Sequence, residues 1–337
     1  MQRYGMTIPF DHVPLADHKE WFEELVDLGY TDLWSAEANG ADAFTPLALA
    51  AAWAPTARLG CAIVPAYTRG PALMAQSVAS MAETAPGRFV FGIGTSSNVI
   101  VERWNGIPFD EPYKKTRDMV RFLKLALTGE KVDADFDTLT VKGFRLGRKS
   151  PEVPPILVAA LRPGMLRLAG READGAIINW LSADDVKQVA PIVQGAGADA
   201  AGADAAGADA AGAGPTGKEI VARIFVCPST DADTVRNYGR MAIAAYLNVP
   251  VYAAFHEWLG RSDRLQPMWD AWSAGDRKAA TAAIPDSVVD ELIVHGEPAA
   301  CREHIARYVD NGVTTPVLAV LPFGVDMRQA MRDLAPQ

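Results

Sequence analysis

Cysteine is scarce in this chain of 337 residues. Cys61, Cys227 and Cys301 are far apart, odd in number and without metal-ligand spacing, so no disulfide framework is implied and a reducing, cytoplasmic compartment fits best. The five histidines form no H-E-x-x-H or similar pattern, and no metal site is expected. The pair Ser96-Ser97 lacks the G-x-S-x-G context of a nucleophile elbow.

Long apolar runs and an excess of basic charge are missing as well. No stretch approaches the ~18 uninterrupted apolar residues of a membrane span, and Met1–Asp11 lacks the regions of a signal peptide. The 32 Lys and Arg residues stand against 41 Asp and Glu residues, a formal net charge of −9. This balance argues against nucleic acid or a membrane as partner, but it leaves room for a local basic pocket that holds a phosphorylated cofactor.

What the chain does have is a regular alternation of short apolar runs and amphipathic helical patterns. The expected strands are Tyr4–Ile8, Thr31–Trp34, Arg58–Val64, Phe89–Ile93, Pro155–Ala159, Gly175–Ile178, Glu219–Val226 and Thr315–Leu321. The expected helices are His18–Leu28, Pro46–Ala54, Ala72–Ala82, Tyr113–Leu127, Gly164–Gly170, Asp231–Leu247, Pro298–Asn311 and Val325–Leu334, with a β-hairpin inserted at Lys131–Leu146. About eight strand–helix units predict an α/β protein with a (β/α)8 TIM barrel and insertions, one domain over residues 1–337. The alternative is an open doubly wound sheet.

One segment is of low complexity. Gly197–Ala211 consists of three copies of Gly-Ala-Asp-Ala-Ala, a period of five that matches neither a helix nor a strand and supplies no large apolar side chain. We therefore expect a Gly/Ala/Asp surface loop over residues 195–217, solvated and mobile, on the barrel face opposite the active site. No catalytic role is assigned to it.

Three strand ends carry small residues. They lie in the segments Gly60–Pro71, Phe91–Ser97 and Val158–Gly164, and small residues there allow a planar ring or a phosphate to approach the backbone. The glycine segment fits a Rossmann fingerprint poorly, because it follows the fourth strand and has Ser97 in place of the third glycine. Each segment can equally be a tight turn required for packing. Arg69 is either a surface charge or an anion ligand.

Glu37 is the best single acid–base candidate. It follows the second strand, three residues after Trp34, and a carboxyl group beside aromatic surface can have its pKa raised toward the range useful for proton donation. The competing interpretation is a solvated loop carboxylate.

Together these segments resemble the luciferase-like monooxygenase superfamily. The residues that carry the resemblance are Leu59–Gln76, Gly87–Ser97 and Trp104–Phe109, while Pro155–Gly170 and Ala173–Leu181 are similar to the coenzyme F420-dependent branch, which includes methylenetetrahydromethanopterin reductase. The resemblance covers most of the chain apart from the repeat and the segment 258–283. It implies a TIM barrel with the cofactor across the carboxyl ends of the strands, and a homodimer.

The resemblance also implies residue roles. It places a non-prolyl cis peptide between Ala62 and Ile63, pressing on the cofactor ring, and a residue that faces the reactive ring at Glu37. It gives cofactor-binding positions to Ala62, Ile63, Gly94, Thr95, Ser96, Ser97, Ala159, Ala160, Leu161 and Arg162. We expect Trp34, Tyr67, Asn179 and Trp180 to shape the substrate pocket. The sugar-phosphate dehydrogenases of this branch have a histidine at the Glu37 place and a glutamate where Ser97 stands, so sugar-phosphate oxidation is not expected.

The implied function is hydride transfer between coenzyme F420 and a small organic substrate with an unsaturated or imine-like acceptor. A monooxygenase that uses reduced FMN and oxygen is the first alternative, and a flavin-binding barrel without turnover is the second. The aromatic segment 248–283 is expected to be a mobile cover or a dimer contact.

Overall fold

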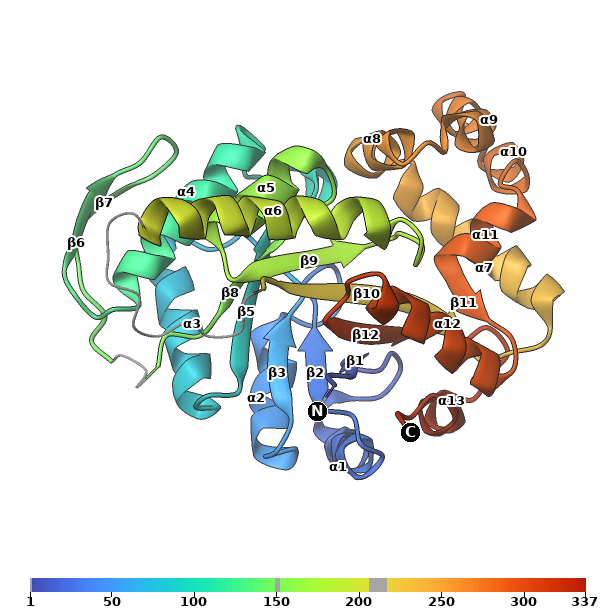
Figure 1. The fold of residues 1–337 in the computed structure, drawn as a ribbon, viewed down its shortest axis with the longest axis horizontal. Helices are drawn as coiled ribbons and strands as arrows, with labels where there is room; N and C mark the ends of the chain where they lie inside the picture. Colours follow the sequence, from blue (N-terminus) through green and yellow to red (C-terminus); the bar gives the residue numbers. More distant parts are fainter. Residues whose placement is uncertain (1, 149–151, 206–216) are drawn as a thin grey trace.

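The computed structural model describes residues 2–148, 152–205 and 217–337. Its centre is a barrel of parallel strands in which each strand pairs with two neighbours, and β1 pairs with both β2 and β12 (Figure 1). In order around the barrel they are β1 (Gly5–Thr7), β2 (Asp32–Ser35), β3 (Arg58–Cys61), β5 (Phe89–Gly94), β8 (Ile156–Ala159), β9 (Gly175–Asn179), β10 (Glu219–Cys227) and β12 (Thr315–Val320). The closed ring confirms the predicted TIM barrel. The open doubly wound sheet is wrong, because such a sheet leaves two unpaired edges.

Helices surround the barrel and bury one face each. They are α1 (Lys19–Asp27), α2 (Phe44–Trp53), α3 (Pro71–Thr84), α4 (Pro112–Ala126), α5 (Pro163–Glu172), α6 (Val186–Ala205), α12 (Pro298–Asp310) and α13 (Met327–Asp333). In α1, for example, Phe22 and Leu25 are fully buried while Glu20 is exposed, which is the three-to-four residue spacing of an amphipathic helix. A 3-10 turn at Leu15–Asp17 precedes α1, and a π-helical turn at Val99–Trp104 follows β5.

Two insertions interrupt the strand–helix series. The predicted hairpin is present as β6 (Val132–Asp135) and β7 (Thr140–Phe144). A larger insertion lies between β10 and α12. It consists of α7 (Ala232–Leu247), α8 (Pro250–Trp258), α9 (Ser262–Ser273), α10 (Arg277–Ala282), α11 (Asp286–Leu292) and β11 (Ile293–His295). The aromatic segment 248–283 is therefore helical, and it packs with α7 and α11 around a second apolar cluster.

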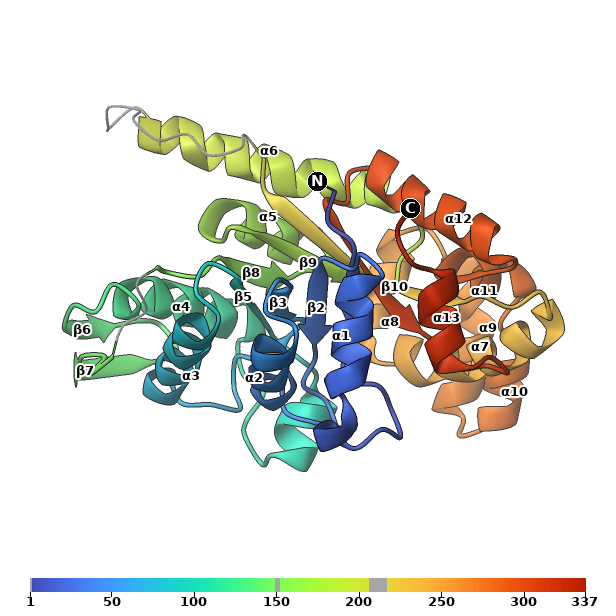
Figure 2. The same ribbon diagram turned by 90° about the horizontal axis from the view of Figure 1, so that it is seen from below.

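The repeat differs from its predicted conformation. Helix α6 continues to Ala205, so residues 195–205 are helical rather than a loop, and the remaining residues 206–216 of the expected loop lie outside the described part. Small side chains explain the close packing against α5: a Cβ on Gly170 would lie 2.3 Å from the carbonyl oxygen of Val193 and 2.9 Å from the Cβ of Ala196. Figure 2 shows α6 extending past the barrel.

The barrel interior is filled in layers. At the amino ends of the strands, Arg58 forms two hydrogen bonds of 2.6 Å with Glu219 and one of 3.2 Å with the fully buried Asp32. Above this ion cluster lies an apolar layer made by Trp34, Val90, Leu157, Ile177, Val221 and Val317. Gly60 is required here, because a Cβ at this position would lie 2.3 Å from the indole of Trp34. A packed interior of this kind closes the barrel below and leaves the carboxyl ends of the strands for a site.

Candidate active site

The small residues at three strand ends converge on one side of the barrel mouth. A Cβ placed on Gly94 would lie 2.8 Å from the Cβ of Ala159 and 3.2 Å from Cγ1 of Ile63. The amide of Ala66 donates to the carbonyl of Gly94 at 2.9 Å, and the two-residue strand β4 (Val64–Pro65) pairs with the end of β5. The three segments therefore converge as expected. We call the surface formed by Ala62, Ile63, Gly94 and Ala159 the small-residue wall.

The third strand ends in the cis peptide that the resemblance implied. The bond between Ala62 and Ile63 is cis. The amide of Ala62 donates to the carbonyl of Ser35 at 2.6 Å, and the amide of Glu37 donates to the carbonyl of Ile63 at 3.2 Å. These two hydrogen bonds fix the backbone of Glu37 beside the small-residue wall.

The Glu37 carboxylate is in a polar environment. It accepts hydrogen bonds from the guanidinium of Arg69 at 2.7 Å, the amide of Ala43 at 3.2 Å and the hydroxyl of Thr68 at 3.4 Å. We expected Glu37 to lie beside an aromatic ring. The structure places Arg69 there instead, with its guanidinium 5.0 Å from the ring centroid of Phe44. Arg69 thus answers the question left open by the sequence: it is an ion-pair partner of the candidate acid–base residue.

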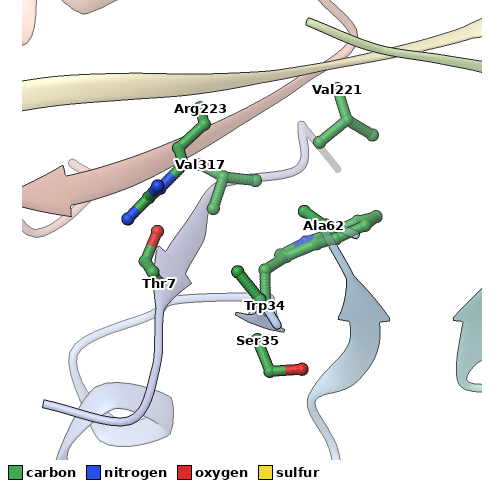
Figure 3. Close-up of a pocket in the computed structure, with 8 residues that line it drawn as sticks. Thr7, Trp34, Ser35, Ala62, Val221, Arg223 and Val317 are labelled. Atoms are coloured by element: carbon green, nitrogen blue, oxygen red, sulfur yellow. The ribbon is translucent and has the colours of Figure 1, made fainter. Parts of the chain in front are cut away.

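A narrow crevice lies inside the barrel next to Ala62. It is lined by Thr7, Trp34, Ser35, Ala36, Ala62, Val221, Arg223 and Val317 (Figure 3). Three of its lining side chains bear a buried polar atom without a hydrogen-bond partner among the described residues: Oγ1 of Thr7, Nε1 of Trp34 and Nε of Arg223. Buried polar atoms are normally paired. The crevice has no room for a water molecule in this structure, so a ligand would reach these atoms only if its walls move apart.

The four residues expected to shape the substrate pocket are not all in one place. Trp34 lines the cavity. Asn179 and Trp180 lie together at the end of β9, where the amide of Trp180 donates to Oδ1 of Asn179 at 2.9 Å and the indole stacks on Phe225 at 4.0 Å. The hydroxyl of Tyr67 donates to the carbonyl of Asp110 at 2.6 Å, so this side chain holds the loop before α4.

The glycine segment and the start of α5 provide main-chain groups at the mouth. Ser96 has a φ of 61°, and the carbonyl of Ser97 accepts from the amide of Val101 at 2.9 Å, which folds the loop onto the π-helical turn. Arg162 is the exposed residue before the ten-residue helix α5, and no side chain caps that helix. Free amides at a helix start attract phosphate.

Two polar side chains, one fully buried and one half-buried, were not predicted from the sequence. His256 in α8 is fully buried; burial, reinforced by the charge of Arg261, lowers its pKa from 6.5 to about 3. Arg223 stands in the otherwise apolar run Ile220–Cys227. Side chains of a strand alternate between its two faces, so Arg223 shares the inner face of the barrel with Val221. This alternation is the sequence signal that indicates an inward-facing arginine.

A barrel of this topology, with its site at the carboxyl ends of the strands, defines the class of TIM-barrel enzymes. Residues 2–315 match the family described as luciferase-like monooxygenase, and the chain belongs to this family. It is 27% identical to 5,10-methylenetetrahydromethanopterin reductase of Methanolobus tindarius, over 90% of each chain.

Solved structures share the fold. The coenzyme F420-dependent tetrahydromethanopterin reductase of Methanopyrus kandleri superposes with a TM-score of 0.79 at 18% identity, covering 99% of this chain and 97% of that one. An FMN complex of a type II Baeyer-Villiger monooxygenase from Pseudomonas putida gives a TM-score of 0.65 at 15% identity, with the same coverage. Among the described residues, no helix is both long and apolar enough to cross a bilayer.

Proposed function

We propose that this chain is a coenzyme F420-dependent oxidoreductase that transfers a hydride between the deazaflavin and a small organic substrate with an unsaturated or imine-like acceptor. The observation that carries the proposal is the mouth of the barrel. Small residues gather around Gly94, and Ala62 of the same group lines a crevice whose buried polar atoms on Thr7, Trp34 and Arg223 have no hydrogen-bond partner among the described residues. The similarity to methylenetetrahydromethanopterin reductase over 90% of the chain supports the choice of cofactor.

The residues present fit such a cofactor. A flat ring needs a surface with few protruding side chains, and Gly94 with the methyl groups of Ala62 and Ala159 offers one beside Ile63. The segment Thr95–Ser97 would border the ring. The segment Ala160–Arg162 would hold the phosphate, because it leads into the uncapped start of α5.

The bound deazaflavin would supply a carbon centre that carries a hydride and activates oxygen poorly. The protein's own task is then to position the substrate, exclude water and move a proton. Glu37 is the acid–base candidate, and Arg69 positions its carboxylate through the 2.7 Å hydrogen bond. To act as an acid, Glu37 must exchange this partner for a proton when the substrate is bound.

Two alternatives use the same barrel. A monooxygenase that binds reduced FMN is favoured by the likeness in fold to the FMN-bound Baeyer-Villiger monooxygenase. A barrel that holds a flavin without turnover would require no mobile acid, and the paired state of Glu37 is compatible with it.

A cofactor titration separates these functions. We expect the quenching of F420 fluorescence to give a dissociation constant at least tenfold lower than that for FMN. With F420 bound, unsaturated and imine acceptors are then screened for oxidation of the reduced coenzyme at its visible absorbance band. Tighter binding of FMN together with oxygen consumption would favour the monooxygenase. Binding without hydride exchange with any acceptor would favour the non-catalytic barrel.

Homodimerisation and a cytoplasmic location belong to the same proposal. The three cysteines are free and buried, which suits a reducing compartment. Tyr238 and Met241, one turn apart on α7, are 52% and 59% exposed, and apolar side chains of this size suit a subunit contact. Sedimentation equilibrium of the wild-type protein and of a Tyr238→Ser/Met241→Ser variant tests the dimer.

A further inference from the structure

Arg223 and Asn179 lie side by side at the place where two barrel strands separate. They are register partners at the end of the β9–β10 pairing, so their side chains share the inner face of the sheet. Beyond this pair β10 turns to β11, with Phe225 opposite Ile293. Both side chains therefore stand at the mouth rather than in the packed interior.

The Arg223 guanidinium has no counter-charge in the described part of the chain. Its side chain points from β10 into the cavity toward Thr7 (Figure 3). It lies 5.0 Å from the ring centroid of Phe225, and its Nε is buried and unpartnered. Arg58, at the other end of the same barrel, is paired with both Glu219 and Asp32. A cation that is partly withdrawn from water is costly unless an anion neutralises it, and the described residues do not provide that anion for the half-buried Arg223.

The neighbours of Arg223 are donors as well. Nδ2 of Asn179 lies 3.5 Å from the hydroxyl oxygen of Tyr252. Burial raises the pKa of Tyr252 to about 12, although the charge of Arg223 acts in the opposite direction, so the phenol keeps its proton at neutral pH. A guanidinium, an amide and a phenol are complementary to the oxygens of an anion.

The position in the barrel indicates which molecule brings the anion. The small-residue wall belongs to β3, β5 and β8, whereas Arg223 belongs to β10, across the mouth. A ring held against the wall leaves the Arg223 side to the substrate. Beside it, Trp180 stacks on Phe225 at 4.0 Å and contacts Tyr246 at 5.1 Å, which provides an aromatic surface for a planar group.

We propose that Arg223, with Asn179 and Tyr252, binds the carboxylate of the substrate, so that the substrate is a small unsaturated organic acid. This inference rests on the proposed function, because it takes the opposite wall as the cofactor side. Arg223 is thereby a specificity-determining residue, and the carboxylate holds the reducible bond near the ring.

Acid and amide pairs of the same shape test the inference. The probes are cinnamate with cinnamamide, benzoate with benzamide, and crotonate with crotonamide, titrated by calorimetry into the full chain with and without F420. We expect the wild type to bind at least one acid tenfold or more tightly than its amide. Arg223→Met should reduce this ratio to below twofold, and Arg223→Lys should retain part of it. The matched control is Arg167→Met, an exposed arginine on α5, which should leave the ratio unchanged.

Each result is decisive. No preference for any acid in the wild type, or an equal preference in Arg223→Met, overturns the inference. If Arg223→Met weakens F420 binding tenfold and leaves the acid-to-amide ratio intact, the anion belongs to the cofactor and the inference is wrong. Thermal unfolding checks whether Arg223→Met is folded. If it is not, the acid-to-amide ratio of Arg223→Lys, expected between one and the wild-type value, decides. If the wild type does not bind F420, the proposed function fails, while titration of the unloaded chain still decides whether Arg223 binds anions.

Discussion

The Arg69 guanidinium donates a 2.7 Å hydrogen bond to the carboxylate of Glu37, although the two residues are separated by 32 positions in the sequence. Both side chains are largely buried, with 17% and 16% of their surface exposed. The candidate acid–base residue is therefore held by a cation at the edge of the small-residue wall. Its chemistry depends on a residue that supplies no proton itself.

Glu37→Gln keeps the size of the side chain and removes its proton transfer. We expect turnover with an acceptor found in the screen to fall by about a hundredfold or more, because general acid catalysis contributes roughly 10²–10⁴. The F420 dissociation constant should change by less than about threefold. An unchanged turnover number from pH 5 to 9 would remove Glu37 from the mechanism.

Arg69→Met tests the positioning role. Without the 2.7 Å hydrogen bond from Arg69 the Glu37 carboxylate is no longer held in one orientation, and we expect the turnover number to fall about tenfold while KM changes by less than about threefold. Arg69→Lys should restore most of the wild-type turnover number, since it keeps a cationic donor. An unchanged turnover number in Arg69→Met would assign Arg69 a purely structural role.

Glu219 should stabilise the barrel in a pH-dependent way. Burial alone would raise the pKa of this carboxyl, but the hydrogen bonds and charge of Arg58 outweigh it, and the net pKa is lowered from 4.5. A lowered pKa contributes stability that is complete above about pH 4.5 and is lost as the pH falls through the lower folded value. Glu219→Gln should therefore cost about 3 kcal/mol at pH 7.

The measurement is urea unfolding from pH 7 to 3. The difference between wild type and Glu219→Gln should narrow below about pH 4.5, where the ion pair of the wild type is being protonated. Glu130→Gln, whose side chain is 77% exposed, is the control and should stay near the wild type throughout. A difference that is constant with pH would show that the loss is one of packing alone.

Burial of His256 should destabilise the folded protein at acidic pH. Its pKa is lowered to about 3 by burial, so between pH 6.5 and 3 the unfolded chain binds a proton that the folded chain does not, and stability falls as the pH decreases. His256→Leu removes this penalty. When the pH is lowered from 7 to 5, the free energy of unfolding of wild type should fall by about 2 kcal/mol relative to that of His256→Leu, which is about 1.4 kcal/mol for each pH unit below 6.5. The exposed His12, replaced by Asn, should show no such change; a parallel pH course for wild type and His256→Leu contradicts the prediction.

Gly60→Ala should disturb Trp34. The added Cβ would lie 2.3 Å from the indole, and overpacking of a core costs about 1–3 kcal/mol. We expect a lower midpoint of thermal unfolding, a changed near-UV circular dichroism spectrum and weaker F420 binding. Gly40→Ala is the matched control because nothing lies within 4 Å of its Cβ position. Equal midpoints for the two variants would show that Trp34 can move freely.

The strands and the wall could be predicted because their determinants are local. Parallel strands buried on both faces give apolar runs such as Phe89–Gly94, and small residues at their ends are visible in the sequence. The ion-pair partner of Glu37 could not be predicted because Arg69 lies 32 positions away in the sequence. The unpaired Nε of Arg223 could not be predicted either, because it depends on which side chains the closed barrel brings near it. The helix over the first part of the repeat could not be predicted because its small residues pack on Gly170, which belongs to another helix.

The packing of α6 on α5 decides what a change in the number of repeated units would disturb. Helix α6 packs on α5 through Gly170 and Ala196, at the point where the first Gly-Ala-Asp-Ala-Ala unit begins. Units added or lost after that contact would leave the packing of α6 on α5 in place, since Gly170 and Ala196 precede the repeated units.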